Sequence, residues 1–232
     1  MDSAMVLDEN VFAIEGGELY GGNQYWFERD GGAECGATTA ANIFAYFLKT
    51  RSGPGAEDVK GIELDTKAGY MNFMELVRKY IHWSRKEFGL QPPSFIKGSN
   101  ELAGYLGLPV RSDAKADRFR IAEAPMGRQA AESMIADARG FIKSSIGMNA
   151  PLAFLNLSPL GFLSNRKIDS QIELWHWVTV IGLDDRSDLK VKILDNNRIY
   201  EADLTDWMRD GWNSGSFVRL RYGADAAVEI LR

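Results

Sequence analysis

The chain of 232 residues contains a single cysteine, Cys35, and two histidines. Cys35 follows a glycine-rich stretch and stands where a helix-forming run begins, CGATTAANIFAYFL at residues 35–48. At a helix start, unpaired backbone N–H groups and the positive end of the helix dipole stabilise a thiolate over a thiol. A lone cysteine is more often a buried apolar filler. This placement, off the apolar stripe of the expected helix, instead favours a reactive nucleophile.

A nucleophilic thiol needs a base, and the two histidines offer different surroundings. His82 lies within an expected amphipathic helix at 70–89, where a place on the helix surface or its boundary accounts for it. His176 opens the strand-like run HWVTVIGL between two tryptophans, where the end of a strand would meet a cleft. The sequence therefore points to His176 as the general base and assigns no chemistry to His82.

The strand that begins at His176 is followed by the polar turn DDRSD and by a second run, LKVKILDNN. This pattern is typical of an antiparallel hairpin. If Leu183 faces Leu189 or Lys190 across the turn, the start of the first strand lies beside the end of the second. His176 then neighbours residues 195–197, where a carboxylate or amide could fix the orientation of its imidazole.

Two residues of this stretch, Asp195 and Asn196, compete for the orienting role. Neighbouring strand residues point to opposite faces, so only one can reach His176, and a one-residue slip exchanges them. With Leu183 opposite Lys190, Asp195 falls on the face that carries His176. The DNN sequence is also typical of a turn that ends a strand.

Four stretches of the chain together resemble papain-like cysteine peptidases. They are NQYW at 23–26, CGATTAANIFAYFL at 35–48, HWVTVIGLDD at 176–185 and LDNN at 194–197. The resemblance is closest to the branch around bacteriocin leader peptidases, which cut after double-glycine leaders, and to their stand-alone bacterial relatives. Residues of roughly 52–150 carry no match to this family.

The resemblance implies a role for each residue at a matching position. Cys35 would be the nucleophile, His176 the general base and Asp195 the carboxylate that follows the histidine strand, where papain uses an asparagine. The side-chain amide of Gln24 would donate to the oxyanion beside the backbone N–H of Cys35. Relatives often read Gly-Cys-Gly-Pro at the nucleophile, whereas this chain reads ECGA, and Glu34 brings a negative charge that would oppose a thiolate if close.

The function expected from these residues is a cysteine peptidase acting on a peptide or protein substrate. No metal or organic cofactor is needed, and one cysteine with two separated histidines lacks metal-ligand spacing. Two alternatives remain: a transglutaminase-like acyltransferase, which shares the Cys, His, Asp order, and a non-enzymatic binding domain on the same scaffold. An extended peptide could lie in a groove lined by Trp26, Phe27, Trp175 and Trp177.

The order of elements predicts an α+β fold in a single domain of residues 1–232, because helical and strand-like runs are segregated. The helical part covers about 33–150 and the β-rich part about 151–232, so that a nucleophile helix precedes an antiparallel sheet carrying His176 and Asp195. We expect loop before residue 33, helices at 35–48, 70–89, 99–106 (capped by Ser99) and 127–147, a helical turn in 205–211, and strands at 151–157, 174–183, 189–194 and 216–222.

Composition narrows the classes of partner. Apolar residues make up 45% of the chain, which is enough for a sizeable core. The net charge of −5 argues against nucleic acid and anionic membranes as partners. No run is long and apolar enough for a membrane span, and the N-terminus MDSAMVLDEN lacks the features of a signal peptide. The sequence is compatible with a cytoplasmic protein or with one secreted after trimming.

Overall fold

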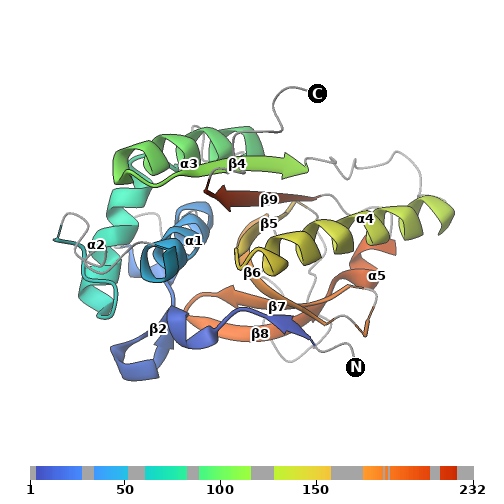
Figure 1. Ribbon diagram of the computed structural model, residues 1–232, viewed down its shortest axis with the longest axis horizontal. Helices are drawn as coiled ribbons and strands as arrows, with labels where there is room; N and C mark the ends of the chain where they lie inside the picture. Colours follow the sequence, from blue (N-terminus) through green and yellow to red (C-terminus); the bar gives the residue numbers. More distant parts are fainter. Residues whose placement is uncertain are drawn as a thin grey trace.

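Helices and one large antiparallel sheet make up the described part of the chain, which is the expected α+β arrangement (Figure 1). The computed structural model describes residues 4–27, 34–51, 61–82, 89–115, 128–157, 175–184, 186–187, 189–209 and 215–223.

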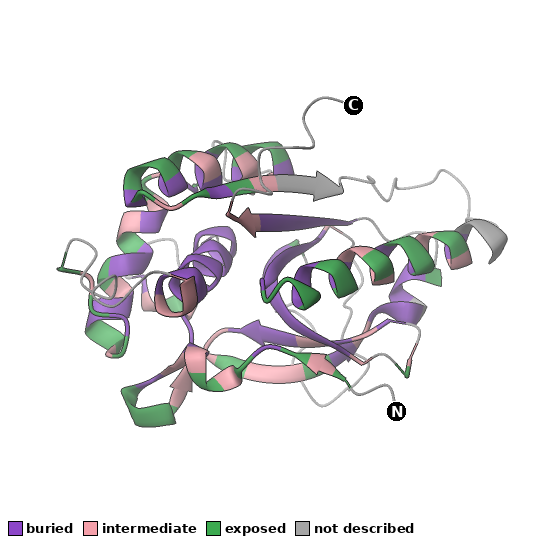
Figure 2. Ribbon diagram, in the orientation of Figure 1, coloured by how far each residue is buried: buried purple, intermediate pink, exposed green. Residues whose placement is uncertain are grey.

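Helix α1, Cys35–Arg51, runs through the middle of the molecule, and every residue from Cys35 to Leu48 is buried (Figure 2). It packs against the sheet, against the next helix and against the N-terminal segment. The sequence predicted a single apolar stripe along this helix. The structure buries all its faces, which is possible because no charged side chain occurs in the helix before Lys49.

The main sheet has seven strands, six of them in the order β4-β9-β5-β6-β7-β8, and all the pairs are antiparallel. The short strand β1 also pairs with β6, near its end. The bounds are β1 Met5–Val6, β4 Val110–Lys115, β5 Leu152–Asn156, β6 His176–Asp184, β7 Lys190–Asp195, β8 Arg198–Asp203 and β9 Gly215–Tyr222.

Four further helices lie beside α1 and the sheet: α2 Lys67–Arg78, α3 Pro92–Leu106, α4 Arg128–Gly147 and α5 Leu204–Arg209. Helices α2 and α3 lie on one side of α1 and α4 and α5 on the other (Figure 1). The predicted start of α3 at Ser99 was wrong, because Ser99 is buried inside a helix that begins at Pro92. Proline is favoured in the first turn, where its missing N–H costs no helical hydrogen bond.

Helix α2 ends at Arg78, earlier than the predicted helix at 70–89, and His82 lies beyond it in an exposed position. Residues 83–88 of that prediction lie outside the described residues. The predicted helices at 35–48 and 127–147 and the turn after residue 204 are confirmed by α1, α4 and α5.

The N-terminal segment, predicted as loop, contains short elements. They are β1, the 3-10 turns η1 Glu9–Phe12, η2 Glu15–Gly17 and η3 Gln24–Trp26, and the small β2–β3 hairpin, Ala13–Ile14 with Leu19–Tyr20. Turns η1 and η3 both pack against α1. The segment therefore holds Gln24 against the central helix.

The β6–β7 hairpin is antiparallel, as predicted, but its register at the turn differs from the prediction. Leu183 pairs with Val191 rather than with Leu189 or Lys190. An irregularity between Val180 and Gly182 then shifts the ladder by one residue. A β-bulge of this kind adds one residue to one strand, and it restores the predicted register at the end of the hairpin that carries His176.

Besides the short N-terminal strands, β4 and β8 were not predicted, and they lie at the two ends of the six-strand order of the main sheet. β4 lies within the range expected to be helical. Among the described residues, no helix combines the length and the apolar character needed to cross a membrane.

Candidate active site

Cys35 is the first residue of α1, where the sequence placed it. The N–H of Thr38 donates to the carbonyl of Glu34 at 2.9 Å, so the first helical turn begins at this junction. The first N–H groups of a helix have no acceptor within the helix, and they present a positive end to the sulfur. Cys35 keeps 9% of its surface exposed.

Gly36 has a packing role at the start of α1. It lies within α1, and a Cβ atom at this position would be 2.3 Å from Cδ2 of Leu90 and 3.3 Å from Cδ1 of Trp177. Any larger residue would push Leu90 away or displace the start of the helix. The glycine therefore lets the helical turn that carries Cys35 lie close to β6.

Glu34 is almost fully buried beside Cys35, but its charge is paired. Nε of Arg78, on α2, lies 2.8 Å from Oε1 of Glu34, and the same guanidinium stands 5.4 Å from the ring centroid of Phe27. The pair places a cation next to the carboxylate, which offsets its opposition to a thiolate. The ECGA sequence is thus compatible with a charged sulfur.

His176 is the first residue of β6, and its neighbour Trp177 fixes that strand end. The indole N–H of Trp177 donates to the carbonyl of Leu90 at 2.8 Å, and its ring stacks on Phe95 with centroids 4.5 Å apart. Both contacts join β6 to α3 and to the segment before it. The buried side chain of Trp177, through its hydrogen bond and its ring contact, therefore holds the backbone of the adjacent His176 in place.

Asp195, not Asn196, is the residue against His176. Nε2 of His176 lies 3.0 Å from Oδ1 of Asp195, and both side chains are about 5% exposed. At this distance the two groups form an ion pair when the imidazole is protonated. With Nε2 turned to Asp195, the other ring nitrogen is the one left for the thiol.

The surroundings of His176 raise its pKa well above the usual value. Burial acts to lower it, but the charge and contact of Asp195 and, after them, the thiol of Cys35 outweigh the burial. A raised pKa means that the imidazolium persists at neutral pH. A positive ring beside the sulfur is the arrangement that stabilises a thiolate.

The second oxygen of Asp195 is held from two sides. Oδ2 accepts hydrogen bonds from the hydroxyl of Tyr200, on β8, at 2.9 Å and from Nδ2 of Asn196 at 3.1 Å. These donors fix the plane of the carboxylate and so the direction from which Oδ1 meets His176.

Gln24 begins the turn η3, and its loop is fastened to α1. The side-chain oxygen of Asn42 accepts the N–H of Gly22 at 2.8 Å and the hydroxyl of Tyr70 at 2.8 Å. A Cβ atom on Gly21, whose φ is +59°, would lie 2.5 Å from that oxygen, so the close approach requires glycine. Helix α1 thus carries both Cys35 and the attachment of the Gln24 loop.

The same loop is fastened to the β7–β8 turn. The backbone N–H of Gln24 donates to Oδ1 of Asn196 at 3.3 Å, and Nδ2 of Asn23 donates to Oδ1 of Asn197 at 2.5 Å. Oε1 of Gln24 is buried and has no hydrogen-bond partner among the described residues. The structure therefore places Gln24 next to the residue that contacts Asp195.

The four aromatic residues predicted to line a groove have different surroundings. Trp177 and Phe27 are buried, and Trp26 is partly buried below the ammonium of Lys67, 5.2 Å from its ring. Only Trp175 is exposed, at 56%, and its φ of +54° is unusual for a bulky residue. Tyr25, not predicted, is 57% exposed beside Gln24.

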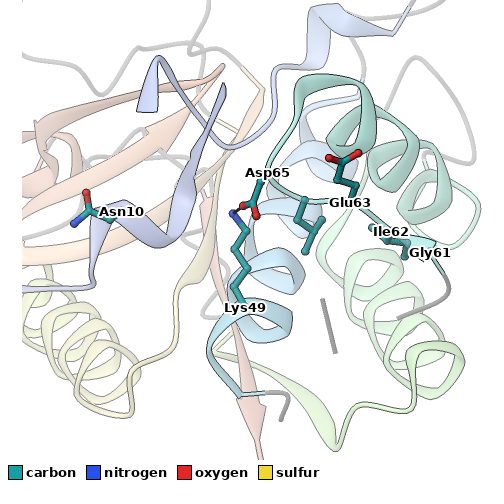
Figure 3. A pocket seen from close by; sticks show the side chains of 7 residues that line it. Asn10, Lys49, Gly61, Ile62, Glu63 and Asp65 are labelled. Atoms are coloured by element: carbon teal, nitrogen blue, oxygen red, sulfur yellow. Dashed lines mark ion pairs between the residues drawn. The ribbon is translucent and has the colours of Figure 1, made fainter. Parts of the chain in front are cut away.

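An open pocket of about 520 Å³ lies at the other end of α1, away from this cluster (Figure 3). Its lining includes Asn10 and the ion pair between Lys49 and Asp65. It contains no histidine or cysteine. In the described ranges, no group of three or more His, Cys, Asp and Glu side chains is suited to a metal ion.

Sequence reasoning missed Tyr200, Arg78 and Asn42. Arg78 and Asn42 contact segments that are distant in sequence, whereas Tyr200 contacts Asp195 across the β7–β8 hairpin. The best signal was for Tyr200, because an Asn-Asn pair between two strands favours a two-residue hairpin and hence a strand after residue 197.

No protein-family model matches the chain, and no curated protein matches it.

Proposed function

We propose that this protein is a papain-like cysteine peptidase. The observation that carries the proposal is the buried series Cys35, His176 and Asp195, in which the thiol stands at a helix start and the imidazole lies 3.0 Å from a carboxylate. Cys35 is the nucleophile, His176 the general acid and base, and Asp195 the residue that orients and charges the imidazole.

The chemistry is acyl transfer through a thioester. The Cys35 sulfur attacks the carbonyl carbon of a peptide bond, and the carbonyl oxygen takes up the negative charge. The C–N bond breaks as His176 gives its proton to the departing amine, which leaves the acyl group on sulfur. Water then attacks the thioester and gives a proton to His176, the acid is released, and the thiolate–imidazolium pair returns.

Gln24 supplies the oxyanion donor in this proposal, together with the backbone N–H of Cys35. Its loop is fastened to α1 and to the turn after Asp195, so the amide is held on the elements that carry the other two residues. Donors fixed in advance stabilise charge that develops only in the transition state.

A peptide or protein chain is the substrate that suits the rim of the site. The exposed aromatic residues Tyr25 and Trp175 directly neighbour Gln24 and His176 in sequence. Aromatic faces with few rotatable bonds bind an extended chain at low entropic cost. The order Gln, Cys, His, Asp and an antiparallel hairpin that joins the last two support a place near the double-glycine leader peptidase branch.

The test is cleavage of a peptide library, followed by mass spectrometry, with the wild-type protein and Cys35→Ser. We expect products from the wild type and a loss of turnover by a factor of about 1,000 or more in the variant. A dansylated primary amine in the same reaction distinguishes hydrolysis from acyl transfer, because a transferase would attach it to the product. Absence of any Cys35-dependent product would refute the proposal.

A further inference from the structure

The side chain of Asn196 connects two parts of the candidate site that come from distant segments of the chain. Its Oδ1 accepts the backbone N–H of Gln24 at 3.3 Å, and its Nδ2 donates to Oδ2 of Asp195 at 3.1 Å. One amide thus contacts, through its oxygen, the loop that carries Gln24 (here called the oxyanion loop). Through its nitrogen it contacts the carboxylate beside His176.

The backbone gives this amide a fixed place. Asn196 and Asn197 are the two central residues of the β7–β8 turn, with φ values of +45° and +57°, and Asp195 pairs with Arg198 across it. Two positive φ values define the tight turn that suits the twist of a hairpin, and asparagine adopts them more readily than most residues. The turn therefore aims the Asn196 side chain from a rigid base.

The oxyanion loop follows the position of this turn. Besides the two bonds of Asn23 and Gln24, the N–H of Asn197 donates to the carbonyl of Gly22 at 2.9 Å. The contacts of Asn197 are with Gly22 and Asn23 and fix the start of the loop, whereas Asn196 contacts Gln24 itself. Loss of the Asn196 side chain would leave the loop attached and free the N–H of Gln24.

We propose that Asn196 is a positioning residue that sets the place of Gln24 relative to the Asp195–His176 pair; this rests on the proposed peptidase function. It touches neither the substrate nor the sulfur in this role. It differs from the third-member role predicted as an alternative for Asn196, because it acts through Gln24 and Asp195. Tyr200 is the natural comparison, since its hydroxyl binds the same Oδ2 and Tyr200→Phe removes that hydrogen bond while keeping the ring.

The experiment is a double-mutant cycle measured as kcat on a peptide that the wild type cleaves. Asn196→Gly keeps the positive φ without strain and removes both side-chain bonds. We expect it to lower kcat about tenfold in the wild type but less than about twofold in Gln24→Ala, because two residues that act through one contact give non-additive losses. Tyr200→Phe is expected to lower kcat by the same factor in both backgrounds.

Two further readouts exclude a general loss of structure. Asn196→Ala keeps the strained φ and is expected to have a lower Tm than Asn196→Gly with the same kcat, so the loss of kcat does not follow stability. The rate of Cys35 alkylation by iodoacetamide, which needs no oxyanion donor, is expected to fall by less than kcat.

Equal losses for Asn196→Gly with and without Gln24, or an unchanged kcat, would overturn the link between Asn196 and Gln24 and leave the peptidase proposal intact. A wild-type protein without Cys35-dependent cleavage would overturn the proposed function, and this inference with it.

Discussion

The two ends of helix α1 place their polar groups in opposite settings. At the start, Cys35, His176 and Asp195 are each less than one-tenth exposed. At the other end, about 21 Å along the helix axis, Lys49 and Asp65 form an ion pair 2.7 Å apart in an open pocket, with Asp65 76% exposed.

The contrast shows that the size of a pocket and the capacity of its side chains for proton transfer are separate properties. An ion pair in water contributes little and shifts the chemistry of its members little. A buried pair cannot be screened, so Asp195 holds a proton on His176 against the opposing effect of burial. The start of the helix is therefore the place where proton transfer can be tuned, whereas the open pocket lies at its other end.

The largest effect is expected at Asp195. Asp195→Ala should lower kcat about a thousandfold, and Asp195→Asn about tenfold at the optimum, because the amide keeps an oriented oxygen without the charge. In Asp195→Asn the pKa of His176 should fall, since burial then acts with less opposition. The alkaline limb of the pH–rate profile should move to lower pH, and an unmoved limb would contradict the account.

The same substitution should also change the stability of the protein, by an amount that depends on pH. The pKa of His176 is raised in the folded state, so its contribution to the free energy of unfolding is complete below the unfolded value of about 6.5 and is lost as the pH rises through the folded value. Asp195→Asn should therefore lower the Tm more at a pH of about 5 than at about 9.

Gln24 comes second in expected effect. Gln24→Ala should lower kcat by about a hundredfold while the rate of thiol alkylation stays near that of the wild type, since alkylation forms no oxyanion. Steady-state kinetics and iodoacetamide labelling of the same preparation measure both quantities. If kcat were unchanged, Gln24 would be an ordinary residue of a well-fastened loop.

Trp175 should act on substrate binding. Trp175→Ala is expected to raise KM roughly three- to tenfold with little change in kcat, the size expected when one exposed aromatic contact is lost. Tyr105→Ala is a matched control, because Tyr105 is another exposed aromatic residue, near the end of α3. Equal effects of the two variants would remove Trp175 from the substrate-binding surface.

The smallest effect is expected at the open end of α1. Asp65→Asn should change the free energy of unfolding by less than about 1 kcal/mol and leave kcat unchanged, because the Asp65 carboxylate is open to solvent, which screens its charge. Chemical denaturation and peptide cleavage test this directly. A large loss of kcat would show that the open pocket beside Lys49 and Asp65 takes part in the reaction.

The sequence predicted the parts of this molecule that depend on local pattern. Cys35 at a helix start, the β6–β7 hairpin and the nearness of Asp195 to His176 all follow from short stretches. The predicted pairing at the turn was wrong, because a bulge between Val180 and Gly182 is not visible in an apolar run. The bulge is also what brings the predicted register back at His176.

Two of the strands that pattern did not reveal, β4 and β8, lie at sheet edges. β4, VRSDAK, and β8, RIYEAD, carry several charged residues, as edge strands often do. The contacts of Arg78 with Glu34 and of Asn196 with Gln24 join distant segments and could not be read from neighbouring residues. Sequence thus indicated the candidate reacting residues but not the residues that hold them.

The most direct test of the account is the alkylation of Cys35 by iodoacetamide in the native protein, followed across pH by mass spectrometry. The positive ring of His176 lies beside the sulfur, so labelling should be fast at mildly acidic pH, where an ordinary thiol reacts slowly. Asp195→Asn should slow this acidic reaction, and Asp65→Asn should not. If Cys35 labels only after denaturation, it is a buried structural thiol, and the account is wrong.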